Sequence, residues 1–142
     1  NAIHERETSH LDRESLARLL AVASFAKGHG DAPDAFLIAM AETAAYDNAN
    51  FRWFKARYPR FVYVDRIVVA QASRGQGIAR HLYETLFIDA KARGADLVGC
   101  EVNIVPPNPE SDSFHAALGF VEAGQALLDN GKLVRYLTRQ LS

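Results

Sequence analysis

The sequence has a single cysteine, Cys100, among its 142 residues. One thiol cannot form an internal disulfide or a multi-thiolate metal site, so we expect a fold held by its hydrophobic core in a reducing compartment, the cytoplasm. The five histidines are scattered, and no two of them have the four-residue spacing that places two ligands on one helical face. The sequence therefore predicts no metal site.

The chain also has no excess of one charge sign, since 16 Lys and Arg face 17 Asp and Glu. Such a balance gives no overall field for a polyanion, so we expect no nucleic-acid partner and look for local anion sites. The longest mostly apolar stretch, residues 16–26, is interrupted by Arg18 and is shorter than the roughly 20 residues of a membrane span. We expect no membrane partner, and a single domain over residues 1–142.

Local patterns in the first half predict alternating helices and strands. A short amphipathic helix is expected over residues 11–23, followed by two strands on either side of a turn at residues 29–33. A further short helix, capped by Asp47 or Asn48, should end before Pro59. Aromatic side chains gather in this region; we expect them to fill the core, with the alternative that some line a substrate mouth.

A strand–helix–strand pattern follows. Residues 61–70 are β-branched and almost apolar on both faces, which is typical of a central strand, but Asp65 and Arg66 interrupt them. A helix over residues 77–93 and a second strand over residues 96–104 complete a βαβ unit, whose two strands must be parallel.

The C-terminal part contains a short helix and a hairpin. Asn108 and Pro109 are suited to the N-cap and first position of a helix that ends near Leu118. Asn130 and Gly131 predict a hairpin with a two-residue turn. The expected fold class is α/β (α+β), a mixed central sheet flanked by helices, and the hairpin edge leaves a homodimer possible.

The segment Arg-Gly-Gln-Gly-Ile-Ala, residues 74–79, lies where the buried strand gives way to the helix. Glycines there let backbone N–H groups point at an anion beside a helix N-terminus. A dinucleotide fingerprint would need glycine at Arg80, and a Walker loop would need Gly-Lys-Ser/Thr, so both fit poorly. We expect a local phosphate site; the alternative is a glycine-rich helix start without a ligand.

This segment resembles the Arg/Gln-x-x-Gly-x-Gly/Ala motif of the GNAT superfamily of acyl-CoA-dependent N-acyltransferases, matched by Arg74, Gly77 and Ala79. Residues 108–120 are similar to the family's Asn-x-x-Ala/Ser-x-x-Phe-Tyr-x-x-Leu-Gly-Phe helix. The resemblance implies transfer of an acetyl or acyl group from acetyl-CoA to an amine by direct attack in a ternary complex. A full member starts with another strand, so we expect one to precede Asn1.

The resemblance also implies how coenzyme A binds. Backbone N–H groups of residues 75–79 would hold its pyrophosphate, and the edge of residues 67–69 would pair with the pantetheine amides. A backbone N–H near Val69 would polarise the thioester carbonyl in the splay between the two parallel strands. The implied cofactor-binding residues are Ile67, Val68, Val69, Arg74, Gly75, Gln76, Gly77, Ile78, Ala79, Asn108, Ser111 and Phe114.

His115 stands where the family has tyrosine, the acid that protonates the departing thiolate. An imidazole can do the same, with a reference pKa of about 6.5 against about 10 for tyrosine. Because Phe114 and Leu118 take the apolar face of the short helix, we expect His115 to face the cleft or water. The alternative is a structural histidine.

An amine acceptor arrives protonated, so a carboxylate should take a proton from it, through water. Alternation places Asp65 on one face of its strand with Tyr63, Ile67 and Val69, and Glu101 opposite Cys100 on the next strand. Glu101 is the first candidate base and Asp65 the second; the alternative for each is a structural ion pair, for example with Arg66. Cys100 and Tyr83 are expected in the core.

Two other functions stay open. A non-catalytic acyl-CoA-binding or sensor module on the same fold is one, because position 115 lacks tyrosine. A protein-interaction domain that uses the aromatic residues between 46 and 63, and needs no coenzyme A, is the other. The sequence leaves the acceptor as a small-molecule or peptide amine.

Overall fold

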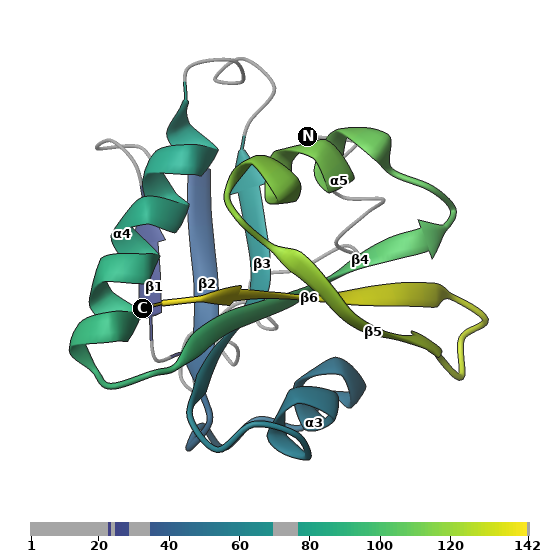
Figure 1. Cartoon of the computed structure of the whole chain (residues 1–142), viewed down its shortest axis with the longest axis horizontal. Helices are drawn as coiled ribbons and strands as arrows, with labels where there is room; N and C mark the ends of the chain where they lie inside the picture. The colour runs from purple at the N-terminus through teal and green to yellow at the C-terminus, as the bar shows by residue number, and fades with distance from the viewer. Residues whose placement is uncertain (1–22, 24, 29–34, 70–76, 142) are drawn as a thin grey trace.

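The computed structural model describes residues 23, 25–28, 35–69 and 77–141. Its secondary structure confirms the predicted fold class (Figure 1). The two helices and the strands predicted for the second half of the chain are all present. The helix expected over residues 11–23 lies, apart from Ala23, outside the described residues. The elements in chain order are β1 (Phe25–Gly28), β2 (Ala35–Ala41), α3 (Ala49–Lys55), β3 (Phe61–Val69), α4 (Ile78–Ala92), β4 (Leu97–Val105), α5 (Pro109–Ala117), β5 (Val121–Leu127) and β6 (Leu133–Gln140).

The strands form one six-stranded sheet in the order β1-β2-β3-β4-β6-β5. Among the described strands only β3 and β4 are parallel, as the βαβ prediction requires, and every other neighbouring pair is antiparallel. β1 and β2 are the two strands expected around residues 29–33. The parallel pair therefore lies at the centre of the sheet, with an antiparallel pair of strands on each side.

The residues that cap the helix ends are those expected from the sequence. The Asn48 side chain accepts hydrogen bonds from two backbone N–H groups at the start of α3. Asn108 caps α5 in the same way, with Pro109 in the first turn. Gly94, after the end of α4, has φ 90°, a left-handed conformation that glycine adopts without steric cost.

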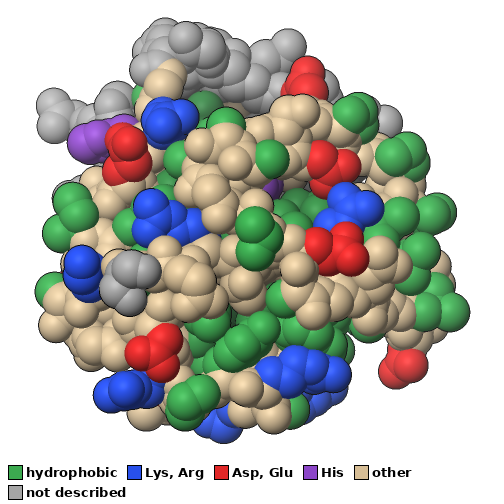
Figure 2. All heavy atoms as spheres, in the orientation of Figure 1, with side chains coloured by type: hydrophobic (Ala, Val, Ile, Leu, Met, Phe, Trp, Pro, Cys, Tyr) green, Lys and Arg blue, Asp and Glu red, His purple; other side chains and the backbone are tan. Residues whose placement is uncertain are grey.

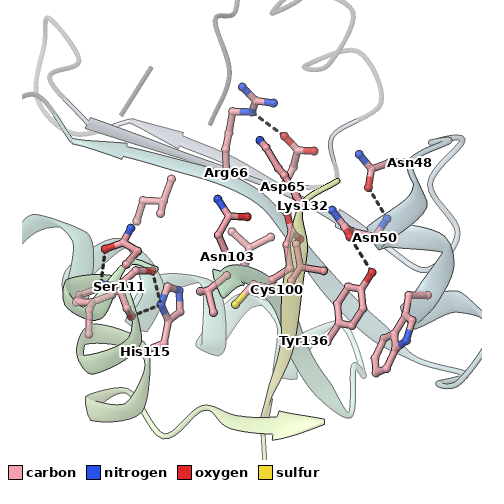
Figure 3. Close-up of a pocket in the computed structure, with 18 of the residues that line it drawn as sticks. Asn48, Asn50, Asp65, Arg66, Cys100, Asn103, Ser111, His115, Lys132 and Tyr136 are labelled. Atoms are coloured by element: carbon pink, nitrogen blue, oxygen red, sulfur yellow. Dashed lines mark hydrogen bonds and ion pairs between the residues drawn. The ribbon is translucent and has the colours of Figure 1, made fainter. Parts of the chain in front are cut away.

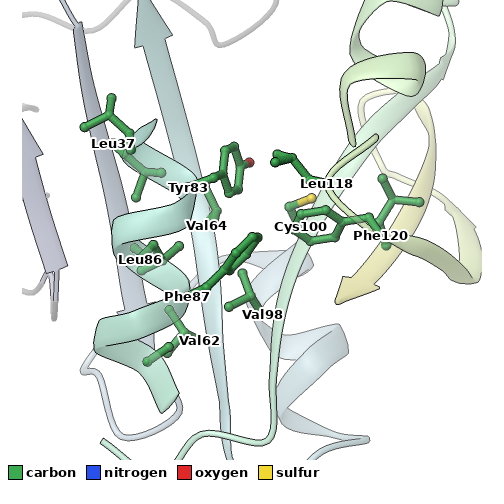
Figure 4. Packing of buried hydrophobic residues seen from close by; sticks show 14 of the residues in the cluster. Leu37, Val62, Val64, Tyr83, Leu86, Phe87, Val98, Cys100, Leu118 and Phe120 are labelled. Carbon is green, nitrogen blue, oxygen red and sulfur yellow. The ribbon is translucent and has the colours of Figure 1, made fainter. Parts of the chain in front are cut away.

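The two faces of the sheet carry separate hydrophobic clusters. α4 packs on one face, where Tyr83 and Leu86 meet Val62 and Val98 (Figure 4). On the other face α3 contributes Phe51 and Phe54 to the second cluster, together with other aromatic side chains. Both faces of β3 are thus covered, which explains its almost continuous apolar sequence. Among the described residues, none of the helices is long and apolar enough to span a membrane.

The hairpin between β5 and β6 is confirmed, but its turn is longer than predicted. Leu128 donates a backbone hydrogen bond of 2.8 Å to the Lys132 carbonyl, and Gly131 donates one of 2.9 Å to the Leu128 carbonyl. The loop therefore has three residues at its tip, with Gly131 at φ 85°. A turn followed by a left-handed glycine is the common three-residue alternative, and the Asn-Gly pair suits both loop lengths.

Candidate active site

The two parallel strands separate soon after they begin. β3 pairs with β4 from Phe61 opposite Leu97 to Tyr63 opposite Gly99, and the ladder goes no further among their described residues. In Figure 1, β3 continues upward while β4 turns aside with β5 and β6. We call this separation beyond Tyr63 and Gly99 the fork. It leaves the β4-facing edge of β3 open for a ligand, and it is the splay expected from the sequence.

A β-bulge in β3 lies just inside the fork. Ile38 of β2 is opposite Arg66 and Ala39 is opposite Val64, so Asp65 is the extra residue. A bulge of this kind reverses the alternation of side chains beyond it. The prediction that Asp65 shares a face with Ile67 and Val69 is therefore wrong, since these two contribute to the α4 side of the sheet.

A cleft of about 1230 Å³ opens at the fork. It is bounded by the start of α4, by α5, by the N-terminal half of α3 and by the β5–β6 loop (Figure 3). On the face of the molecule in Figure 2, positive and negative side chains are interspersed. Attraction of an anionic ligand on this face thus depends on local groups rather than on a region of one charge.

Glu101 lies on β4 two residues beyond the last paired position. Its Oε1 accepts a hydrogen bond of 2.7 Å from the Tyr63 hydroxyl. Burial raises the pKa of Glu101 to about 7, because the desolvation of the carboxylate outweighs the stabilising bond from Tyr63, and the Asp65 charge adds to the increase. Glu101 lines the cleft, so the structure brings a carboxyl group that titrates near neutral pH to the fork.

Asp65 also lines the cleft but is more heavily engaged. Its side chain is 3% exposed, and its Oδ2 lies 2.7 Å from Nε of Arg66. Oδ1 accepts a hydrogen bond from the Tyr46 hydroxyl. The bulge accounts for the adjacent ion pair, because both bulged residues project to the same side of the sheet. This is the ion pair expected as the alternative to a catalytic role for Asp65.

His115 is the buried side chain of α5 and also lines the cleft, so of the two predicted surroundings the structure has the cleft and not water. It is 7% exposed, while Phe114 beside it is only partly buried. Burial lowers the pKa of His115, so the imidazole is neutral at pH 7. Its Nδ1 lies 2.7 Å from the Ser111 carbonyl oxygen, and its Nε2 lies 3.1 Å from the Tyr83 hydroxyl. Leu118 is buried as well, and Phe114 packs partly against the cluster on the α4 side, so the buried side of this segment includes His115 as well as the apolar residues expected there.

The start of α4 opens into the same cleft. Gly77 is its N-cap residue at φ 73°, no side chain of the described residues caps the helix, and its first turn contains no acidic residue. Gly77, Ile78 and Ala79 line the cleft, so N–H groups of the first turn that have no partner within the helix can bind an anion there. Arg74, Gly75 and Gln76, the other predicted members of this loop, lie outside the described residues.

Most of the other predicted cofactor-binding residues surround the cleft as well. Ile67 and Val69 line it from β3, whereas Val68 does not. Asn108, Ser111 and Phe114 line it from α5.

Sequence reasoning missed several residues of the cleft wall. The most notable are Asn50 and Trp53 on α3, and Tyr136 on β6, which hydrogen-bonds the Asn50 side chain at 2.8 Å. The aromatic segment is therefore divided, with Trp53 at the cleft and Phe51 and Phe54 in the core. No sequence signal joins position 50 to position 136, because the pair is made only when α3 packs on β6.

Comparison with known families supports the resemblance. Residues 4–120 match the model of the acetyltransferase (GNAT) family. A comparison with curated protein sequences gives no significant match.

The fold is also similar to solved structures of acetyltransferases. The ribosomal-protein-S18-alanine N-acetyltransferase of Escherichia coli is 17% identical, with a TM-score of 0.66 over 99% of this chain and 84% of that one. Naa20 of Chaetomium thermophilum is 15% identical, with a TM-score of 0.71 over 98% and 79%. The NatC complex structure with Gag peptide and CoA contains a chain 14% identical, with a TM-score of 0.67 over 99% and 89%. By its family match and its fold, the chain belongs to the GNAT family of acetyltransferases.

Proposed function

We propose that the protein transfers an acetyl group from acetyl-CoA to an amine by direct attack in a ternary complex. The observation that carries this proposal is the fork itself. A carboxyl group with a pKa of about 7 stands at the point where two parallel strands separate, and a helix start that no described side chain caps opens into the same cleft. A sensor module would need the second feature but not the first.

In this proposal, three parts of the cleft each bind one part of coenzyme A. The first turn of α4, from Gly77, offers backbone N–H groups and the positive end of the helix dipole to the pyrophosphate. The open edge of β3 offers backbone groups of residues 67–69 to the pantetheine amides, as an added strand would use them. The thioester then lies in the fork, where a backbone N–H near Val69 can polarise its carbonyl.

Glu101 is the base in this proposal. Near pH 7 a substantial fraction of it is ionised, and it can accept a proton from an ammonium group, directly or through water. The neutral amine attacks the acyl carbon and the C–N bond forms, the nitrogen loses its second proton to water in the cleft, the C–S bond breaks, and the sulfur leaves as a thiolate. Asp65 stays the second candidate, since its oxygens are already bonded by Arg66 and Tyr46.

The acceptor is an amine on a peptide or on a small molecule. Structural neighbours include enzymes named for both, a ribosomal-protein-alanine N-acetyltransferase and a nourseothricin acetyltransferase. The wall opposite the start of α4 combines the Trp53 and Tyr136 rings with the Asn50 amide, which suits a partly apolar acceptor. We place the activity in the cytoplasm, where acetyl-CoA and reduced thiols occur together.

Calorimetry with acetyl-CoA, followed by a thiol-release assay, tests the proposal. Binding in the micromolar range and release of free thiol with amines from a panel of short peptides, polyamines and amino sugars are expected. Binding without release by any amine or by water would favour the sensor module. Absence of binding at millimolar acetyl-CoA would leave the protein-interaction domain as the remaining reading.

A further inference from the structure

Tyr83 and His115 form a buried polar pair that the proposed reaction does not yet use. The Tyr83 side chain is 1% exposed, and its hydroxyl oxygen lies 3.1 Å from Nε2 of His115. Because a carbonyl oxygen can only accept, the 2.7 Å contact with Ser111 fixes the His115 proton on Nδ1. Nε2 of the neutral ring is therefore an acceptor, and the Tyr83 hydroxyl donates to it.

The Tyr83 hydroxyl lies at the fork. Figure 4 shows the Tyr83 side chain reaching from α4 toward Cys100, and the hydroxyl and the thiol interact. Cys100 directly follows Gly99, the last residue of β4 that pairs with β3. Tyr83, Cys100 and His115 all line the cleft. The phenol is thus a buried donor at the place where the proposed thioester lies.

Tyr83 and Glu101 approach the fork from opposite faces of the sheet. Tyr83 and Cys100 belong to the hydrophobic cluster on the α4 side. Tyr63, which holds Glu101, belongs to the cluster on the α3 side. In a direct attack the amine adds to one face of the planar thioester, whereas the sulfur is a separate substituent of the acyl carbon. Groups on the two faces of the sheet can therefore act separately, Glu101 on the amine and Tyr83 on the sulfur.

We propose that the Tyr83 hydroxyl donates a hydrogen bond to the departing sulfur of coenzyme A and that His115 is its positioning residue. This inference rests on the proposed function. As the C–S bond breaks, its electron pair stays on sulfur, Glu101 keeps the proton that it took from the ammonium group, and the second proton of the nitrogen passes to water in the cleft. The thiolate held by Tyr83 later takes a proton from water in the open cleft.

The pair with His115 makes this interaction specific to bond breaking. In the ground state the thioester sulfur is a weak acceptor, so the Tyr83 proton stays on Nε2 of His115. A thiolate is a charged acceptor, and hydrogen bonds to charged acceptors are about twice as strong as bonds between neutral groups. As negative charge develops on sulfur, the Tyr83 hydroxyl therefore donates its hydrogen bond to sulfur instead of His115. Only an interaction gained at that stage accelerates the reaction.

The groups that face Tyr83 are mostly uncharged near neutral pH. His115 approaches it from α5 and Cys100 from β4, and burial lowers the pKa of the first and raises the pKa of the second. Glu101, also on β4, is the charged group whose field reaches Tyr83. The phenol therefore keeps its proton and serves as a donor at any pH at which the reaction runs.

Calorimetry with coenzyme A and with desulfo-coenzyme A, which lacks the sulfur, tests the contact without an acceptor. At about pH 9 a fraction of the free thiol is ionised, since the pKa of the comparable cysteine thiol is about 8.5. The unaltered protein should bind coenzyme A about tenfold tighter than the desulfo analogue at that pH, and with a smaller preference at pH 7. Tyr83→Phe should lose the preference, while Tyr58→Phe, outside the cleft, should keep it.

The other outcomes contradict either the role of Tyr83 or the proposed function. Equal preference in Tyr83→Phe and the unaltered protein, with both folded by circular dichroism, overturns the role of Tyr83. No preference at pH 9 in the unaltered protein overturns it without any variant. No binding of either ligand would instead reject the proposed function. His115→Tyr, which restores the family's tyrosine, should return the preference to the Tyr83→Phe protein, and failure of that rescue contradicts the assignment of the sulfur to this side of the fork.

Discussion

The Tyr63 hydroxyl donates a 2.7 Å hydrogen bond to Oε1 of Glu101 from the last paired position of β3. Tyr63 is fixed by the ladder and by its burial in the α3-side cluster, so it holds the carboxylate at a defined place beside the opening. The same bond opposes the effect of burial on the pKa of Glu101. Position and acidity of the candidate base are thus set by one side chain.

Removing that hydroxyl should move the pH dependence of the reaction. In Tyr63→Phe the carboxylate loses a donor, so its pKa rises above about 7 and a higher pH is needed to ionise it. We expect the rising limb of kcat/KM against pH to shift upward, with the largest loss of rate below pH 7. Tyr46→Phe, which removes the corresponding bond to Asp65, is the matched control. A shift in the control instead would identify Asp65 as the base.

Glu101→Gln should abolish the rising limb and lower turnover at neutral pH. General-base catalysis contributes roughly a hundredfold or more, so a loss of that size is expected, with the affinity for acetyl-CoA unchanged within about twofold. Glu42→Gln, at the far end of β2, should behave like the unaltered protein. A rate for Glu101→Gln that stays normal between about pH 6 and pH 9 would transfer the role to Asp65 or to solvent.

The raised pKa of Glu101 also predicts how stability depends on pH. The folded protein holds this proton up to about pH 7, whereas a carboxyl with the ordinary pKa of 4.5 releases it earlier in the unfolded chain. The contribution is complete below pH 4.5 and is lost as pH rises through 7, with an upper limit of roughly 3 kcal/mol. Urea unfolding at several pH values should show this decline for the unaltered protein and a smaller one for Glu101→Gln.

The start of α4 can be tested with two variants of equal size. Gly77 has φ 73° and open space around its Cα, so glutamate and glutamine there carry the same backbone strain. A carboxylate would face the pyrophosphate, so Gly77→Glu should bind acetyl-CoA about tenfold more weakly than Gly77→Gln in calorimetry. The difference should shrink in high salt. Equal affinities of the two variants would contradict the assignment of the pyrophosphate to this helix start.

The sequence predicted what depends on local chemistry. Asn48 and Asn108 cap the helices expected of them. Glu101 was placed on the correct face of β4, because that strand alternates without interruption up to position 103. The family resemblance then identified which helix start and which strand edge belong to one cleft.

What could not be predicted depends on pairing between distant segments. The bulge at Asp65 arises from the register of β3 against β2, and the sequence of β3 alone does not predict it. The hydrogen bond between His115 and Tyr83 could not be predicted either, because Tyr83 lies 32 positions away on another helix. A buried histidine bonded to a tyrosine is indistinguishable in sequence from an exposed one.

One tight contact near the fork gives a prediction about packing. A methyl group added to Gly99 would lie 2.4 Å from the Phe54 ring, closer than nonbonded carbon atoms approach. Gly99→Ala should therefore destabilise the protein by about 1–3 kcal/mol in urea unfolding, because α3 has to move away from β4. Phe54→Leu creates room at that position at its own cost. The double variant should be more stable than the sum of the two single effects predicts, and strict additivity would show that Phe54 does not limit the space above Gly99.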